Sequence, residues 1–320
     1  MTVRPTTPGP QTGSLIDPKV LMTIRNLELR ARVVVEGFWS GLHRSPYHGF
    51  SVEFTEYRAY TPGDDPRYLD WRLFARSDRY YIKRFEEETN LRCHLLVDQS
   101  RSMNYGTLGY TKVQYANTLA ATLAYFLHLQ GDAVGLLTFD ERVRDYLPAR
   151  HRPGHLRHLM LALEKPAAGA ATDLSAPLKQ MAEVMKKRGL VILMSDLLAP
   201  IETLEKDLAG LNACHHEIMV FLLLDPAELR FDFSQAGLYE DVETGRDFYL
   251  DPALARKGYL KRLENHLAAV QQICQSLGIG FHRFTTDRPL ERALFEVLRS
   301  RTQRGKRLRR SGTYARSQPV

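Results

Sequence analysis

Short apolar runs alternate with amphipathic stretches along most of this chain. Five runs have the length of buried strands, and between them apolar residues recur at helical spacing. The predicted buried strands are 91–98, 133–139, 190–194, 218–224 and 280–285. Residues 142–147 alternate in polarity and predict a short edge strand after a turn at Asp140-Glu141. Strands that alternate with helices in this way predict a doubly wound, mostly parallel α/β sheet.

Helical spacing also defines the segments between and before these strands. Residues 17–38 are expected to form one accessory helix, capped by Asp17-Pro18, that packs on the main domain. The remaining predicted helices span about 113–127, 172–188, 201–211, 252–277 and 289–303. Residues 231–250 contain short alternating pieces around Glu243-Thr244-Gly245, which predicts a small hairpin insertion.

Composition suggests four regions along the chain. Residues 1–16 are rich in Pro, Thr and Gly and are expected to be disordered, residues 17–90 form an accessory region, residues 91–303 form the main domain, and residues 304–320 form a basic, disordered tail. The accessory region mixes acids, arginines and aromatic residues over 53–90. Mutual Arg–Asp pairing explains that mixture, and a catalytic carboxylate pair is the alternative.

Composition also bears on the compartment. The hydrophobic content of 44% supports a substantial core, while the longest apolar stretch, 218–224, is far too short to cross a bilayer and the N-terminus has no hydrophobic signal core. Three widely separated cysteines, Cys93, Cys214 and Cys274, suit thiols better than disulfides or a zinc site. We therefore expect a cytoplasmic protein without a membrane partner.

The net charge of +7 comes from one end of the chain. Eight Lys or Arg residues lie between Arg299 and Arg316, and the other 36 basic residues nearly balance the 37 acidic ones. The charge therefore gives no reason to expect nucleic acid on the main domain. Nucleic-acid binding through the tail remains an alternative that the salt dependence of binding would test.

The predicted strand 91–98 leads into the most informative polar group. Asp98 ends the apolar run, and Ser100 and Ser102 follow at alternate positions. One carboxylate and two hydroxyls leaving a strand at the carboxyl edge of a sheet can converge on a divalent cation. A simple turn and helix cap would explain the same residues.

Two later loops favour the metal interpretation. Thr172-Asp173 opens a predicted helix and Ser195-Asp196 closes a predicted strand, so both are expected at the same edge of the sheet as Asp98. The predicted metal ligands are Asp98, Ser100, Ser102, Thr172 and Asp196.

Other signals are weaker. His151, His155 and His158 lie close together, which allows a second metal site but suits a solvated basic helix surface better. The sequence has no Gly-rich phosphate loop, nucleophile elbow, Cys-x-x-Cys pair or zincin helix. We therefore predict no catalytic residues and no small-molecule substrate.

These residues carry two resemblances. The five predicted ligands resemble the metal-ion-dependent adhesion site of von Willebrand factor A domains, and the chain from about 48 to 301 resembles the bacterial von Willebrand A-like family catalogued as domain of unknown function 58. The motifs that carry the second resemblance are Glu53-Phe54, Arg58-x-Tyr60, Gly63-Asp64-Asp65-x-Arg67, Asp70-Trp71, Asp98-x-Ser100-x-Ser102-Met103, Gly131-Asp132, Thr172-Asp173, Ser195-Asp196 and Asp225-Pro226-x-Glu228.

The resemblance implies a fold and a role. It implies the strand order of dinucleotide-binding folds with one antiparallel edge strand, a divalent metal at the top of the sheet, and no known catalysis. Family members are often encoded beside MoxR-type AAA+ ATPases, which implies an adaptor that acts with such an ATPase on other proteins. Many relatives carry N-terminal membrane helices that this sequence lacks, so their membrane roles are not expected here.

The expected function is therefore a non-enzymatic, metal-dependent interaction module. Mg²⁺ or Mn²⁺, held mainly by Asp98, Ser100 and Ser102, would keep a coordination position for a carboxylate from the ATPase or its client protein. For this to work, Arg101 must point away from the metal. A metal-dependent hydrolase that uses Asp98 and Asp196 is the alternative.

Overall fold

The computed structural model describes residues 16–44, 56–59, 80–84, 91–167, 174–185, 188–233, 236–240 and 247–299. The chain divides into two compact units, one of residues 1–41 and 91–320 and the other of residues 42–90. In the second unit, β1 (Glu56–Ala59) pairs antiparallel with β2 (Tyr81–Arg84). The predicted basic tail, nearly all of the N-terminal region 1–16 and most of the predicted Arg–Asp pairing segment lie outside the described residues.

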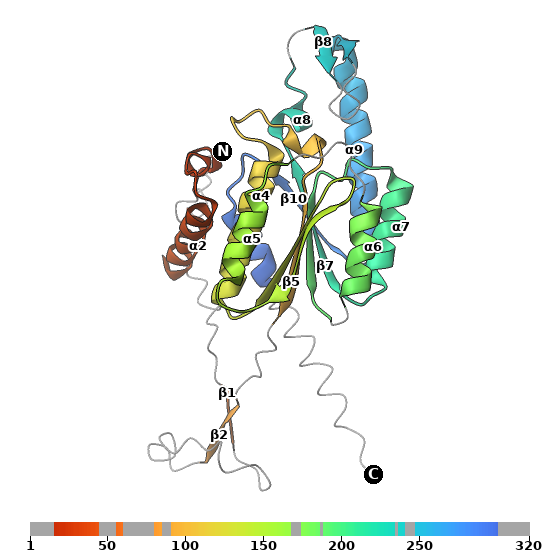
Figure 1. Ribbon diagram of the computed structural model, residues 1–320. Coiled ribbons are helices and arrows are strands. Elements are labelled where there is room, and N and C mark those ends of the chain that lie inside the picture. The colour runs from red at the N-terminus through yellow and green to blue at the C-terminus, as the bar shows by residue number, and fades with distance from the viewer. Residues whose placement is uncertain are drawn as a thin grey trace, which may run out of the picture. The chain divides into compact units, whose positions relative to one another are not determined.

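A six-stranded sheet is the centre of the first unit, and its order is β10-β7-β6-β3-β4-β5 (Figure 1). Its strands are β3 (Arg92–Asp98), β4 (Ala133–Phe139), β5 (Val143–Arg150), β6 (Leu190–Ser195), β7 (Glu217–Leu224) and β10 (Gly280–Thr285). All neighbouring strands are parallel except the edge strand β5, which runs antiparallel to β4. This is the strand order of dinucleotide-binding folds. The predicted von Willebrand A-like fold class is therefore confirmed.

The apolar runs form the inner strands because both faces of the sheet are covered. Every residue of β6 is buried, as are all but the first residues of β3 and β7. The edge strand β5 is mostly half-exposed and extends beyond the predicted 142–147 to Arg150. The register of β5 against β4 shifts between the pairs Val134–Arg150 and Leu136–Leu147. Pro148, which has no N–H to donate, lies within this shift.

Helices cover the two faces of the sheet (Figure 1). On one face lie α2 (Leu27–Arg44), α4 (Lys112–Leu129) and α5 (His155–Leu163), and on the other lie α6 (Ser175–Val184), α7 (Ile201–Asn212) and α9 (Pro252–Ser276). A further helix spans 291–299. The ring of Phe38 on α2 lies 5.9 Å from that of Phe126 on α4 and 4.7 Å from that of Phe295. These aromatic contacts tie the N-terminal helix to the sheet unit.

The predicted accessory helix over 17–38 is two helices. The first, α1, spans Pro18–Met22, and the chain turns before α2 begins at Leu27. Asn26 accounts for the interruption, since its side-chain oxygen accepts a hydrogen bond from the backbone N–H of Leu29 at 2.7 Å and so starts a new helix. Residues up to Gly41 belong to the sheet unit, whereas the predicted accessory region grouped them with residues 42–90.

The predicted insertion after β7 contains a short helix and a hairpin. After α8 (Pro226–Arg230), β8 (Gly237–Glu240) pairs antiparallel with β9 (Asp247–Leu250). None of the three cysteines forms a disulfide, and Cys93 and Cys274 are buried. Among the described residues, no helix is both long enough and apolar enough to cross a membrane.

Candidate metal-binding site

Three parallel strands deliver polar side chains to one edge of the sheet. β3 ends at Asp98, β6 ends at Ser195 just before Asp196, and β7 ends just before Asp225. Because parallel strands place their carboxyl ends together, residues from three distant parts of the chain meet there. All four of these polar residues are fully buried.

Asp98 binds neutral donors. Its Oδ1 atom accepts a hydrogen bond from the Ser100 backbone N–H at 2.9 Å, and its Oδ2 atom accepts one from the Ser195 hydroxyl at 2.6 Å. The hydroxyls of Ser100 and Ser102 lie 3.1 Å apart, where the loop enters the 3₁₀ turn η2 (Ser102–Asn104). A carboxylate and three hydroxyls therefore form one oxygen cluster.

Burial changes the proton affinity of this cluster. Loss of water around the carboxyl group, together with the negative charge of Asp196, raises the pKa of Asp98 to about 7. The hydrogen bonds from Ser195 and Ser100 oppose that rise only in part. The Asp98 site thus holds a carboxylate whose negative charge a cation would stabilise.

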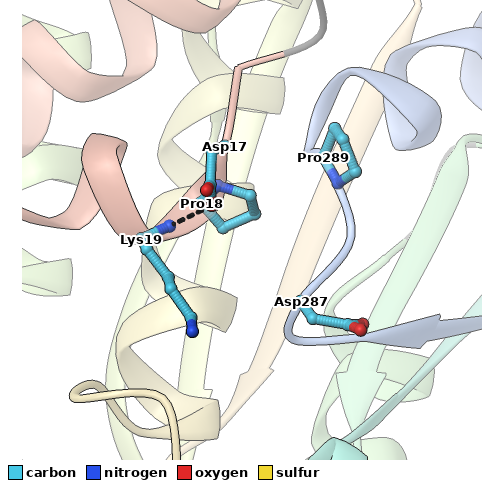
Figure 2. A pocket seen from close by; sticks show the side chains of 5 residues that line it. All are labelled: Asp17, Pro18, Lys19, Asp287 and Pro289. Carbon is cyan, nitrogen blue, oxygen red and sulfur yellow. Dashed lines mark hydrogen bonds between the residues drawn. The ribbon is translucent and has the colours of Figure 1, made fainter.

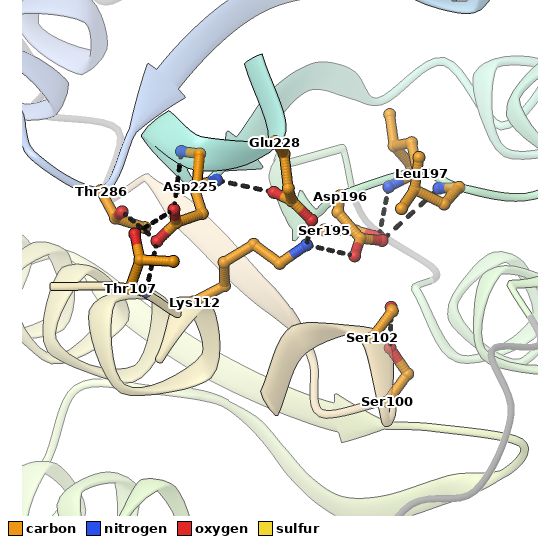
Figure 3. A network of polar contacts seen from close by, with 12 residues as sticks. Ser100, Ser102, Thr107, Lys112, Ser195, Asp196, Leu197, Asp225, Glu228 and Thr286 are labelled. Carbon is orange, nitrogen blue, oxygen red and sulfur yellow. Dashed lines mark hydrogen bonds and ion pairs between the residues drawn. The ribbon is translucent and has the colours of Figure 1, made fainter. Parts of the chain in front are cut away.

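A lysine neutralises the neighbouring carboxylate. The Nζ atom of Lys112 donates to Asp196 Oδ2 at 2.9 Å and to Glu228 Oε1 at 2.6 Å, and the lysine side chain is fully buried. Figure 3 shows the lysine reaching between these two acids from the start of α4. Burial lowers the pKa of Lys112, but the two carboxylates outweigh burial and the net pKa is raised, so the lysine is a fixed cation at neutral pH.

Asp225 fixes the next part of the edge. Its carboxylate accepts hydrogen bonds from the hydroxyl of Thr107 at 2.6 Å and from the backbone N–H groups of Thr107 and Ala227, each at 2.9 Å. Its own N–H donates to Glu228 Oε2 at 2.7 Å, which completes a capping box at the start of α8. Glu228 is therefore held from both sides, by Lys112 and by the backbone of Asp225.

The structure brings four of the five predicted ligands to this edge. Asp98, Ser100 and Ser102 form the oxygen cluster, while Asp196 lies beside it and is paired with Lys112. The fifth, Thr172, lies outside the described residues, as does Asp173. Arg101 is half-buried.

Sequence reasoning missed two members of the site. Ser195, which was not among the predicted ligands, donates its hydroxyl hydrogen bond to Asp98. Lys112 could have been found, since it stands four residues before Ala116 on the apolar face of α4, where a cation requires a buried partner.

The donor set fits a hard divalent cation. Carboxylate and hydroxyl oxygens are the ligands of Mg²⁺ and Mn²⁺, and Asp98, Ser100 and Ser102 present such oxygens together. The same edge also holds the acids Asp196, Asp225 and Glu228, of which Asp196 and Glu228 are paired with Lys112. In the described part of the chain, no three His, Cys, Asp or Glu residues form a group that could hold a metal ion.

The predicted solvated histidine surface is only partly correct. His151 and His158 are exposed, but His155 is buried with its Nε2 atom 2.8 Å from the carbonyl oxygen of Val134. This contact joins α5 to β4 and gives His155 a structural role.

A separate surface hollow of about 370 Å³ lies between the start of α1 and the loop after β10 (Figure 2). Asp17, Pro18, Lys19, Asp287 and Pro289 line it. Asp17 is occupied as the cap of α1, because its Oδ1 atom accepts from the Lys19 backbone N–H at 2.8 Å. The described residues that line it include no nucleophile with an adjacent base.

Similar proteins were found by sequence and by structure. An uncharacterized protein of Mycobacterium tuberculosis is 29% identical over 287 residues, which is 88% of this chain and 89% of the relative. The conserved hypothetical protein BatB from Bacteroides thetaiotaomicron has a TM-score of 0.48 at 13% identity, over 67% of this chain and 99% of BatB. The VWA domain of SpRpn10 has a TM-score of 0.39 at 12% identity, over 64% of this chain and 94% of that domain.

The family assignment comes from the sequence. The family model described as "Protein of unknown function DUF58" matches residues 56–269, which is more than half of the chain. The match includes β3, β6 and β7 and the polar residues that follow them. This chain belongs to the DUF58 family of proteins of unknown function.

Proposed function

We propose that this protein is a non-enzymatic interaction module that recognises an acidic side chain of a partner protein through Mg²⁺ or Mn²⁺. Asp98, Ser100 and Ser102 would hold the ion, and Thr172 is proposed as a further ligand. When bound, the ion supplies a Lewis-acidic position that a partner carboxylate can occupy. The observation that carries the proposal is the oxygen cluster of Asp98, Ser100 and Ser102 at the sheet edge.

The ligand chemistry supports recognition of an external acid. Asp98 brings one negative charge, whereas the serine hydroxyls are neutral, so an ion at this cluster would keep much of its positive charge. Ser195 orients Asp98 through its 2.6 Å hydrogen bond and leaves the other oxygen of that carboxylate toward the serine loop. A partner carboxylate would supply the charge that the protein ligands do not.

The surroundings of Asp196 argue against the hydrolase alternative. A hydrolase would need Asp196 as a base toward a water molecule, but its Oδ2 atom is bound to the fully buried ammonium of Lys112. An oxygen that is already engaged by an ammonium is not available to hydrogen-bond the attacking water. We therefore propose binding without catalysis.

The proposed partner is a MoxR-type AAA+ ATPase, or a protein that such an ATPase remodels. This part of the proposal is supported by membership of the family and by the resemblance stated from the sequence. The chemical requirement on the partner is narrower, namely an exposed Asp or Glu that can reach the edge of the sheet.

The deciding experiment uses Asp98→Ala. Calorimetric titration with MgCl₂ and MnCl₂ is expected to show weak binding to the wild-type protein and none to Asp98→Ala, because the variant lacks the carboxylate of the oxygen cluster formed with Ser100 and Ser102. Asp247→Ala, which removes an exposed carboxylate on β9, is the matched control and is expected to bind like wild type. Equal metal affinity in Asp98→Ala and wild type would refute the site.

Partner recognition is read in the same proteins. Capture of the purified ATPase by wild-type protein is expected to fall in excess EDTA and in folded Asp98→Ala, Ser100→Ala and Thr172→Ala. Undiminished capture under those conditions would show that docking does not use the metal.

A further inference from the structure

The pairing of Lys112 with Asp196 raises a question that the family motif does not answer. Asp196 directly follows Ser195, whose hydroxyl donates to Asp98, yet the Oδ2 atom of Asp196 is bound to Lys112 and its Oδ1 atom lies 3.4 Å from the backbone nitrogen of Leu198. The carboxylate is fully buried and both of its oxygens are engaged. A ligand predicted from the sequence is thus already occupied by a cation of the chain.

We infer that Lys112 acts as a built-in cation that withholds Asp196 from the metal and so keeps the metal dependent on a partner's carboxylate. This inference rests on the metal site of the proposed function and assigns to Lys112 the control of its affinity and selectivity. In a site with several carboxylate ligands, the metal ion would neutralise Asp196. Here the ammonium of Lys112 neutralises it instead.

The lysine is positioned too firmly to be an adaptable surface charge. It is the first residue of α4, where Thr111 and Gln114 form a capping box that fixes the start of the helix. Its Nζ atom is held by two carboxylates, and the Tyr105 ring centroid lies 5.9 Å away. Glu228, the second acid, is held by the backbone of Asp225 at 2.7 Å.

The consequence for the metal follows from charge. With Asp196 paired, Asp98 is the one charged protein ligand in the described part of the cluster, and the nearby ammonium repels a divalent ion. Both effects lower affinity for the ion alone. Both also favour a complex in which an incoming carboxylate adds negative charge, so the site binds the ion and the acidic partner together better than the ion by itself.

Lys112→Met tests this inference because methionine keeps most of the volume and removes the charge. Isothermal titration with MnCl₂ is expected to show at least about tenfold tighter binding than wild type, since the site gains one negative charge and Asp196 is released. Water-proton relaxation by the bound Mn²⁺ is expected to fall, because an Asp196 oxygen replaces a coordinated water. Lys112→Arg, which keeps the charge, is the matched control and should retain weak binding.

The double variant Lys112→Met/Asp196→Asn separates ligation from general electrostatics. If Asp196 is the released ligand, the double variant loses the gain in affinity and the change in relaxation. Equal gains in the single and double variants would overturn the inference, as would Mn²⁺ binding in folded Lys112→Met no tighter than in wild type.

Two further arms keep the outcomes distinct. If Lys112→Met does not fold without metal, Lys112→Met/Glu228→Gln is titrated in its place. This double variant leaves one unpaired carboxylate instead of two, and the same gain in Mn²⁺ affinity is expected. Should wild type bind no Mn²⁺ while Lys112→Met binds it through Asp196, the proposed function fails and the inference about Lys112 stands. Failure of both proteins to bind Mn²⁺ overturns both.

Discussion

The two ends of the central sheet bury ionisable side chains in opposite ways. At the carboxyl edge, buried acids keep partners, since Asp196 faces Lys112 and Asp98 accepts from Ser195. Toward the amino end, His94 on β3 is 7% exposed, and its buried Nδ1 atom has no hydrogen-bond partner among the described residues. One end retains charge by pairing it, and the other packs an imidazole without full hydrogen bonding.

Electrostatics makes the contrast sharper. Burial, with help from His216 and Arg92, lowers the pKa of His94 to about 4, so the ring is neutral at physiological pH. The ring also packs tightly, because a Cβ atom at Gly135 on the adjacent strand β4 would lie 2.8 Å from its Nδ1. The comparison shows that the carboxyl edge pairs the buried carboxylate of Asp196 with a cation, whereas the ring of His94 is held neutral.

The largest expected effect comes from removing the cation at the charged end. Lys112→Met leaves Asp196 and Glu228 without their ammonium, and breaking a buried ion pair from one side costs about 3–5 kcal/mol of unfolding free energy. Urea denaturation at pH 7.5 without metal measures it. Lys257→Met, an exposed substitution on α9, is the control and should change stability by less than about 0.5 kcal/mol. A loss in Lys112→Met no larger than in this control would mean that the acids at this edge need no pairing.

The neutral end is expected to respond to acid. The folded-state pKa of His94, about 4, lies below its ordinary 6.5, so the unfolded chain takes up a proton first as pH falls. Above pH 6.5 His94 does not change the free energy of unfolding. As the pH falls from 6.5 to 4, its protonation in the unfolded chain lowers that free energy by on the order of 3 kcal/mol in total. Urea denaturation at several pH values should therefore show a shallower loss for His94→Leu than for wild type.

Exposed His158 on α5 provides the comparison for that experiment. His158→Leu should follow the wild-type pH dependence because the substitution leaves His94 and its surroundings unchanged. If His94→Leu and wild type lose stability in parallel, protonation of His94 does not contribute, and the contrast between the two ends would rest on packing alone.

The same contrast explains how much of the molecule can be predicted from its sequence. Strands such as Ala133–Phe139 and Gly280–Thr285 appear where they were expected, because burial on both faces selects continuous apolar runs. The place of Asp98, Ser100 and Ser102 was also predictable, since Asp98 ends a strand and the two serines follow it at the edge of the sheet where ligands bind.

Most of the features that the sequence analysis did not predict depend on contacts between distant segments. Lys112 is separated from Asp196 by 84 residues and from Glu228 by 116, and no local pattern shows that the three meet. His155 was assigned to a solvated surface because its neighbours are basic, yet its ring nitrogen contacts the carbonyl oxygen of Val134 on β4. The break between α1 and α2 depends on Asn26, whose capping role competes with an uninterrupted helical pattern.

The smallest expected effect tests whether the charged end is redundant. Thr107→Val removes the hydroxyl that donates to Asp225 at 2.6 Å but keeps the shape of the side chain and the backbone donor of residue 107. Because Asp225 retains two backbone N–H donors at 2.9 Å, we expect a loss of only about 1 kcal/mol in urea denaturation. Mn²⁺ affinity measured by calorimetry should change by less than about twofold, since the substitution keeps the charge of Asp225 and its contact with Glu228, which holds Lys112. A loss as large as that of Lys112→Met would instead make the whole carboxyl edge one cooperative network, in which no hydrogen bond to Asp225 can be removed without releasing Lys112.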